Sequence, residues 1–182
     1  MERPIVPSGL QQSILTQLTA LFDGVATHYQ LVRSARKEKR KATSPSHEQA
    51  ENHISELDQE LLRLHSSAPP IIPHMTVGIN AVTKALETEI RSGRKTVIIT
   101  DRAVDETLFS TRAIFICHAD LDTPALVAHL PQLVALCNSA RSENQKIRVV
   151  PLPAGASTSL ANALGYLKRV SVLAIDVCPF RL

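Results

Sequence analysis

From about residue 71 onward, helical patterns alternate with short apolar runs, and this alternation limits the possible folds more than any other feature of the chain. Apolar residues spaced three or four apart predict helices at 80–91, 124–138 and 157–167. Apolar, β-branched runs predict strands at 96–100, 113–117, 147–150 and 170–175. Because such alternation gives a sheet covered by helices on both faces, we expect an α/β fold, a three-layer α-β-α sandwich with a mixed central sheet.

The first 70 residues follow a different pattern. Apolar side chains with a period of 3.6 predict one long amphipathic helix, with Gly24 as its weak point; they occupy positions 14, 18, 21, 22, 25, 29 and 32. A basic run over 33–41 follows, then Ala-Thr-Ser-Pro-Ser-His-Glu, which indicates a linker, then a second apolar stripe at Ile54, Leu57, Leu61 and Leu64. We therefore expect a helical, basic extension and linker at 1–70 and a compact α/β domain at 71–182. The extension's apolar stripe fits docking on its own domain or on a partner.

The basic run has three interpretations. Its cations, Arg33, Arg36, Lys37, Lys39, Arg40 and Lys41, form a solvated helix face, a nuclear-import signal or an RNA contact. The formal charge of +3 permits a polyanionic partner without requiring one.

The cysteine spacing and the hydropathy of the chain indicate its cellular compartment. Cys117, Cys137 and Cys178 lack the short paired spacings of a zinc site or a redox dithiol, so we expect buried or idle thiols in a reducing compartment. No apolar run approaches the roughly 18 residues of a membrane span, and the first residues lack the build of a signal peptide. We expect a cytosolic or nuclear protein with no membrane partner.

Residues 78–84, Gly-Ile-Asn-Ala-Val-Thr-Lys, open the first predicted helix of the domain. Gly78 lets a backbone approach closely, the Asn80 amide both donates and accepts at a base edge, and Lys84, one turn later, meets a phosphate. Unpaired N–H groups at a helix N-terminus, here those of Ile79 and Asn80, also face anions. The alternative is an Asn that caps the helix and a Lys in solvent.

Three segments, in order, resemble the kink-turn-binding ribosomal-protein superfamily. Thr-Val-Gly-Ile-Asn-Ala-Val-Thr-Lys-Ala-Leu-Glu at 76–87 is similar to its signature helix. Residues 116–133 resemble its strand, acidic turn and Leu-Pro helix, and residues 150–165 its apolar loop and Leu-Gly helix. Gly-Ile-Asn-x-Val-Thr-Lys-x-Leu-Glu, Leu-Pro-x-Gly-Ala, the basic extension and an insertion over 90–112 are most similar to the fungal Pop-three subunits of ribonuclease P and ribonuclease MRP.

That resemblance implies a non-catalytic, RNA-binding subunit of a ribonucleoprotein whose RNA is the catalyst. Its partners would be a kink-turn-like element of that RNA and other protein subunits, its role precursor tRNA and rRNA processing, and its place the nucleus, within it the nucleolus. No cofactor or metal is implied. The implied RNA-binding residues are Gly78, Ile79, Asn80, Ala81, Lys84, Leu152, Pro153 and Ala154. Alternatives are another ribosomal or small-nucleolar component, or a protein-interaction scaffold with secondary RNA contact.

The chain departs from this family pattern at two positions. Ala81 stands where tight kink-turn binders have Glu, whose carboxylate accepts from a guanine. Ala154 stands where relatives often have Lys, which removes a phosphate contact. We expect weaker or more shape-dependent RNA binding. Leu152 and Ala154 either pack against an unstacked nucleotide or belong to a loop that only joins strand to helix.

An enzyme remains the competing interpretation. His118, Asp120 and Asp122 follow a predicted strand, where they would suit a divalent metal or acid-base chemistry. The chain lacks a phosphate-cradling glycine loop, a nucleophile elbow and a His/Cys ligand set, and an Asp before Thr-Pro more simply caps a helix. His74 and His129 have no spaced partner, which favours packing or surface roles.

Overall fold

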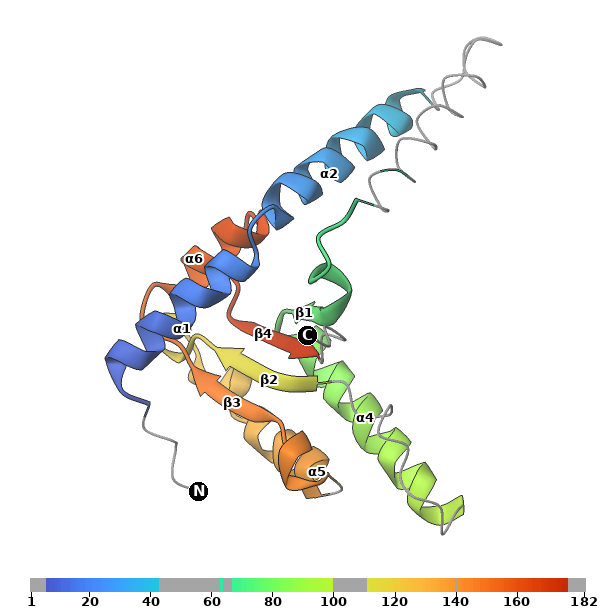
Figure 1. The fold of residues 1–182 in the computed structure, drawn as a ribbon, viewed down its shortest axis with the longest axis vertical. Helices are drawn as coiled ribbons and strands as arrows, with labels where there is room; N and C mark the ends of the chain where they lie inside the picture. The colour runs from blue at the N-terminus through green and yellow to red at the C-terminus, as the bar shows by residue number, and fades with distance from the viewer. Residues whose placement is uncertain (1–5, 43–62, 64–66, 100–110, 140, 177–182) are drawn as a thin grey trace.

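The computed structural model describes residues 6–42, 63, 67–99, 111–139 and 141–176. Its centre is a four-stranded sheet in the order β1-β4-β2-β3 (Figure 1). The strands are β1 (Met75–Val77), β2 (Thr111–Ile116), β3 (Arg148–Pro151) and β4 (Val172–Asp176). β2 and β3 are parallel, whereas β4 runs antiparallel to both of its neighbours, so the predicted mixed sheet is confirmed.

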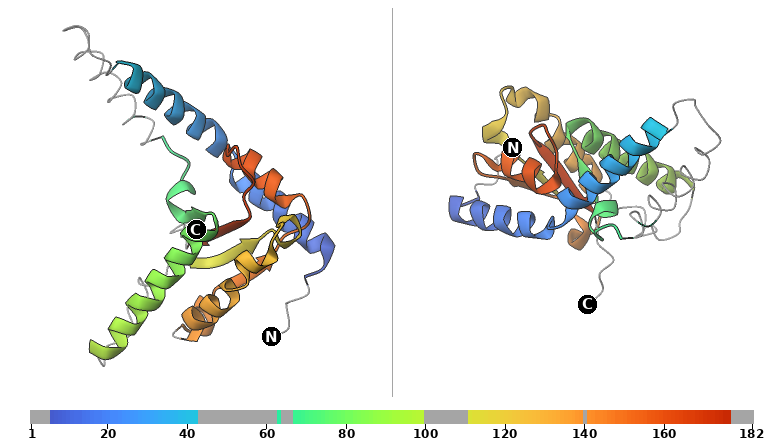
Figure 2. Two further views of the ribbon diagram at one scale, coloured as in Figure 1. Left: turned by 180° about the vertical axis from the view of Figure 1, so that it is seen from behind. Right: turned by 90° about the horizontal axis from the view of Figure 1, so that it is seen from above.

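Helices cover both faces of the sheet (Figures 1 and 2). α1 (Ser8–Leu21) and α6 (Ala156–Leu164) pack on one face, with Phe115 and Leu173 pointing into that core. α4 (Ile79–Ile99) and α5 (Leu130–Ser139) pack on the other, where Ile114 and Val172 are buried. Because successive strand residues point to opposite faces, two apolar layers form and the three-layer sandwich is confirmed.

Within residues 6–42 of the extension the structure has two helices where one was predicted, so that prediction was wrong. α1 ends at Leu21 and α2 (Val25–Ala42) begins after Gly24, whose φ of +78° interrupts the helix at little steric cost. Leu18 and Phe22 are buried in the same core cluster as α6, so α1 docks on its own chain. α2 extends away from the sheet (Figure 1). The division at residue 71 stays a prediction, and a fragment of residues 71–178 that folds alone would support it.

The strand predicted at 96–100 was also wrong, because α4 continues through Ile99. β-branched residues prefer strands only weakly, and an established helix extends more easily than a new element nucleates. The fourth strand is instead the three-residue β1, too short to show a period in the sequence. Residue 100, the whole linker stripe (Ile54, Leu57, Leu61 and Leu64) and Cys178 lie outside the described residues.

The other two predicted helices are shorter than expected. A 3-10 turn, η4 (Pro124–Val127), precedes α5, and the Thr123 side chain makes no capping hydrogen bond. α6 ends at Gly165, whose φ is +68°. Leu126 and Leu167, which belong to the apolar patterns that predicted these helices, are therefore 55% and 94% exposed. Further 3-10 turns are η1 (Ile72–His74), η3 (His118–Asp120) and η5 (Glu143–Gln145).

A buried ion pair fixes α4 against the sheet. The Arg141 guanidinium donates to the Glu89 carboxylate, which also accepts from the Thr111 backbone N–H at 3.0 Å and hydroxyl at 2.7 Å. Arg141 donates to the Thr111 carbonyl as well, at 2.6 Å. α4, the start of β2 and the segment after α5 are therefore held together, which sets the position of the α4 N-terminus.

Two described cysteines are buried free thiols, as predicted. Burial raises the pKa of Cys117 to about 12 and is the main cause that raises the pKa of Cys137 to about 11. Both are protonated at neutral pH and unsuited to nucleophilic or metal-binding roles. Among the described segments, no helix is both long and apolar enough to cross a membrane.

Candidate nucleic-acid interface

The sequence-predicted site residues lie along one edge of the sheet. β1, β2 and β3 run in the same direction, so their carboxyl ends meet there beside the start of β4. Hydrogen bonds from Gly78 N to Val172 O and from Leu152 N to Ile116 O, each 2.9 Å, mark its two ends. Three strand intervals of about 4.8 Å separate these ends by roughly 14 Å.

Residues 78–84 present unused polar groups at this edge. Gly78 has a φ of +101°, a conformation that only glycine adopts without strain, and turns the chain from β1 into α4. The first bond of α4 runs from Val82 N to Gly78 O, so the three preceding N–H groups have no helical acceptor. Asn80, Ala81 and Lys84 are exposed. Asn80 lies inside the first turn, after the residue that would cap the helix, so its amide is available to a ligand.

This helix start lines a groove, which we call the basic groove. Its opposite wall is the segment between α6 and β4, and its volume of about 1210 Å³ exceeds the roughly 300–1,000 Å³ of small-molecule pockets. The lining cations are Lys84, Arg91, Lys168 and Arg169. Arg91 pairs with Glu87 at 3.4 Å, whereas Lys84 and Lys168 form no ion pair with any residue in the described part of the chain. The groove is therefore suited to a macromolecular polyanion.

Several groove residues were not predicted from the sequence. Lys168 and Arg169 follow Tyr166 in an exposed segment that the prediction assigned partly to a helix. His129 lines the floor, where its ring lies 2.8 Å from the Thr83 hydroxyl and joins α4 to the segment before α5. The only sequence signal for Lys168 and Arg169 was that two cations are adjacent. Their position beside residues 78–84 could not be predicted, because it depends on the pairing of β1 with β4.

The second predicted segment lies differently. Leu152 is 3% exposed and belongs to the core beneath α1 and α6. Pro153 is half-buried and Ala154 is exposed, and none of the three lines the basic groove. Of these three residues, only Ala154 and part of Pro153 are open to a ligand.

The acidic turn holds the adjacent loop in place. The two carboxylate oxygens of Asp120 accept hydrogen bonds from the backbone N–H groups of Gly155 at 2.7 Å and Ser157 at 2.8 Å. Burial alone would raise the pKa of Asp120, but these hydrogen bonds and the charge of Arg169 outweigh it and keep that pKa below its usual value. Asp120 thus caps the N-terminus of α6, an ordinary role for a carboxylate.

Asp122 is the other carboxylate of the competing enzyme interpretation. Asp122 is exposed and shares no hydrogen bond with Asp120. Among the described residues, no group of three or more His, Cys, Asp or Glu side chains has the arrangement of a metal site.

The fold and the groove define a small α/β protein with a surface for a polyanion. The chain belongs to the family described as RNase P subunit Pop3, whose model matches residues 45–177. That match spans the whole sheet and every residue of the basic groove. No curated protein sequence matches the chain.

Proposed function

We propose that this protein is a non-catalytic, RNA-binding subunit of RNase P and RNase MRP that holds a kink-turn-like element of the catalytic RNA. The observation that carries the proposal is the basic groove, which is lined by Lys84, Lys168 and Arg169 and includes the start of α4, where the first N–H groups have no helical acceptor. The membership of the family supports the ribonucleoprotein context. Precursor tRNA and rRNA processing, other protein subunits as neighbours and a nuclear, nucleolar location follow from that context.

Each group in the groove has a distinct task in this proposal. The Ile79 and Asn80 N–H groups bind a phosphate at the bend of the RNA, and Gly78 leaves room for its close approach. Lys84 and Lys168 neutralise phosphates on either side, while the Asn80 amide contacts a base edge. Ala81 offers no acceptor to a guanine, so recognition rests on the shape of the RNA more than on its sequence.

The test compares full-length Asn80→Ala/Lys84→Ala with Arg148→Ala, which removes an exposed cation from β3. Filter binding to a kink-turn RNA at several salt concentrations should show weaker binding for the double variant. For the double variant, the slope of log affinity against log salt concentration should be smaller in magnitude, by about the amount that one phosphate contact contributes. Arg148→Ala should match the wild type. Equal affinity of the double variant and wild type would move the RNA surface elsewhere.

The non-catalytic role has a separate test in reconstituted particles. His118→Ala/Asp120→Asn should leave precursor-RNA cleavage intact at matched occupancy of the subunit, since Asp120 already accepts two backbone hydrogen bonds. Lost turnover in a fully assembled particle would restore the enzyme interpretation.

A further inference from the structure

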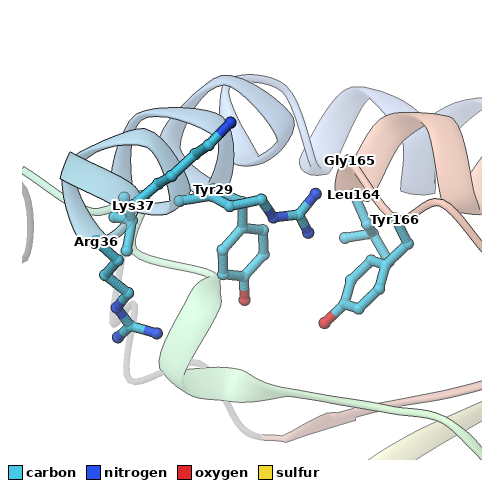
Figure 3. Close-up of a pocket in the computed structure, with 8 residues that line it drawn as sticks. Tyr29, Arg36, Lys37, Leu164, Gly165 and Tyr166 are labelled. Carbon is cyan, nitrogen blue, oxygen red and sulfur yellow. The ribbon is translucent and has the colours of Figure 1, made fainter. Parts of the chain in front are cut away.

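Both tyrosines of the chain meet at one place on its surface. The sequence has 2 Tyr and no Trp. Tyr29, on α2, and Tyr166, just after α6, have ring centroids 6.1 Å apart at an interplanar angle of 68°. Figure 3 shows the two rings beside one another at a pocket, with the Tyr166 hydroxyl directed to the side of Tyr29. Tyr166 is 40% exposed and Tyr29 is half-buried, so each ring keeps some accessible surface.

Gly165 explains why the two rings meet. Its φ of +68° ends α6, and a Cβ placed there would lie 3.0 Å from the Ala26 Cα. The end of α6 is therefore in backbone contact with the first turn of α2, closer than any other residue would permit. Tyr166 follows Gly165 directly. A hydrogen bond from the Tyr166 N–H to the Ala161 carbonyl, 2.8 Å long, then directs Tyr166 toward α2.

Three cations surround the tyrosines. Arg33, Arg36 and Lys37 line the same pocket, which has a volume of about 800 Å³. Arg33 and Arg36 follow Tyr29 at helical spacing and so share its face of α2. All three cations are exposed and form no ion pair within the described residues. We call this site, built from α2 and the end of α6, the tyrosine pocket.

Tyr166 lines the tyrosine pocket and also the basic groove. The two sites are therefore adjacent, and Tyr166 joins them. We propose that the tyrosine pocket binds an unpaired, single-stranded stretch of the same RNA, with a base stacked on the rings and phosphates held by Arg33 and Arg36. This inference rests on the proposed function and extends its surface onto the N-terminal extension.

The chemistry of the pocket favours RNA over an acidic protein segment. Proteins recognise unpaired bases by stacking them on aromatic rings, and they combine such rings with cations that track the backbone. An acidic peptide would use the cations but would gain little from two ring faces. Burial, with a smaller contribution from Tyr166, raises the pKa of Tyr29, so its hydroxyl stays neutral and does not repel phosphate at neutral pH.

The tyrosines also supply the readout. Since the chain has no Trp, its intrinsic fluorescence comes from Tyr29 and Tyr166 alone. The probes are a blunt kink-turn RNA and the same RNA with a single-stranded uridine tail on either strand. We expect the tailed RNA to quench the tyrosine fluorescence and to bind more tightly than the blunt RNA.

Four variants of the full chain, one of them a control, assign the effect. Tyr29→Leu should remove the tail's advantage, a loss of roughly 5- to 150-fold for one base stack. Tyr29→Phe, which keeps the ring, should retain it. Arg33→Gln/Arg36→Gln, at exposed positions that do not endanger folding, should lower the affinity for the tailed RNA and the salt dependence of its binding, whereas Arg148→Gln should do neither.

The outcomes separate this inference from the proposed function. If Asn80→Ala/Lys84→Ala weakens binding of the blunt RNA but the tail adds nothing in the wild type, the tyrosine pocket alone is overturned. If that double variant binds blunt RNA normally while Tyr29→Leu abolishes the tail's effect, the groove assignment fails and the pocket stands. Quenching by poly-glutamate equal to that by the tail, unaffected by Tyr29→Leu, would identify a protein-binding site and overturn the inference.

Discussion

Residues 78–84 and 152–154 were both predicted to contact RNA, yet they have different relations to the fold. At the β1 end, Asn80 and Lys84 are exposed and the first N–H groups of α4 have no helical acceptor. At the β3 end, Leu152 is buried, and the N–H groups of Gly155 and Ser157 already donate to Asp120. Both ends therefore have a loop that leads into a helix. At the β1 end, which we call the open end, the first N–H groups of the helix have no helical acceptor. At the β3 end, which we call the closed end, Asp120 of the same chain already accepts from them.

The difference shows how to distinguish a binding helix start from a structural one. An N-terminus with a carboxylate supplied by its own fold has little electrostatic attraction left for a phosphate. One without such a carboxylate, beside cations such as Lys84 and Lys168, keeps that attraction. Substitutions at the closed end should therefore act on stability, and those at the open end on affinity.

Leu152→Ala should have the largest effect. Its side chain is 3% exposed within the core, and Leu→Ala changes at such sites lower the free energy of unfolding by about 2–5 kcal/mol. Urea denaturation measures this loss. Leu136→Ala, at a position 48% exposed on α5, is the matched control and should change stability little. A stable Leu152→Ala with weakened RNA binding would reverse the assignment of this residue to the core.

Asp120→Ala should lower stability by about 2 kcal/mol, because hydrogen bonds to an ionised group contribute roughly 1.5–3 kcal/mol each and less where solvent competes. The pKa of Asp120 is lower in the folded state, so its contribution is present at neutral pH and is lost as pH falls below about 3.9, the ordinary aspartate value. The stability difference between wild type and variant should therefore shrink in acid. Asp122→Ala, at an exposed carboxylate, should show neither effect.

Much of the fold and of the open end could be predicted from sequence, whereas the closed end could not, and the missing part has a physical cause. Local patterns gave the layers, α4 and the polar residues 80 and 84, because periodicity and residue chemistry are local. Local capping was expected only of the Asp before Thr-Pro, Asp122, whereas Asp120 caps α6, 35 residues away, since the parallel pairing of β2 with β3 brings them together. The groove's Lys168 was missed for the same reason, because the pairing of β1 with β4 is not local.

At the open end, Ala81→Glu should raise affinity for a standard kink-turn by ~1–3 kcal/mol, the range for one good base contact. Residue 81 is exposed beside Asn80, so a carboxylate there can accept from a guanine. Affinities for matched and guanine-substituted RNAs at one salt concentration test this, and the gain should vanish on the substituted RNA. Weaker binding to both RNAs would mean that the helix does not approach a kink-turn as the resemblance implies.

Ala154→Lys should produce the smallest change and tests how far the RNA surface extends. Ala154 is exposed on the same sheet edge as Gly78, about 14 Å away across three strand intervals. If the RNA spans that distance, the new cation adds one phosphate contact, less than about 1 kcal/mol at an exposed site, and steepens the salt dependence by about one. Affinity measured across a salt series separates this effect from noise, since the slope changes even where the gain at one salt concentration is small.

Thr158→Lys, at an exposed position within α6, controls for a general gain from added positive charge. If affinity and salt dependence increase for Ala154→Lys alone, the loop lies against RNA and the two ends differ less than proposed. If both substitutions have equal effects, the specific RNA surface is confined to the basic groove.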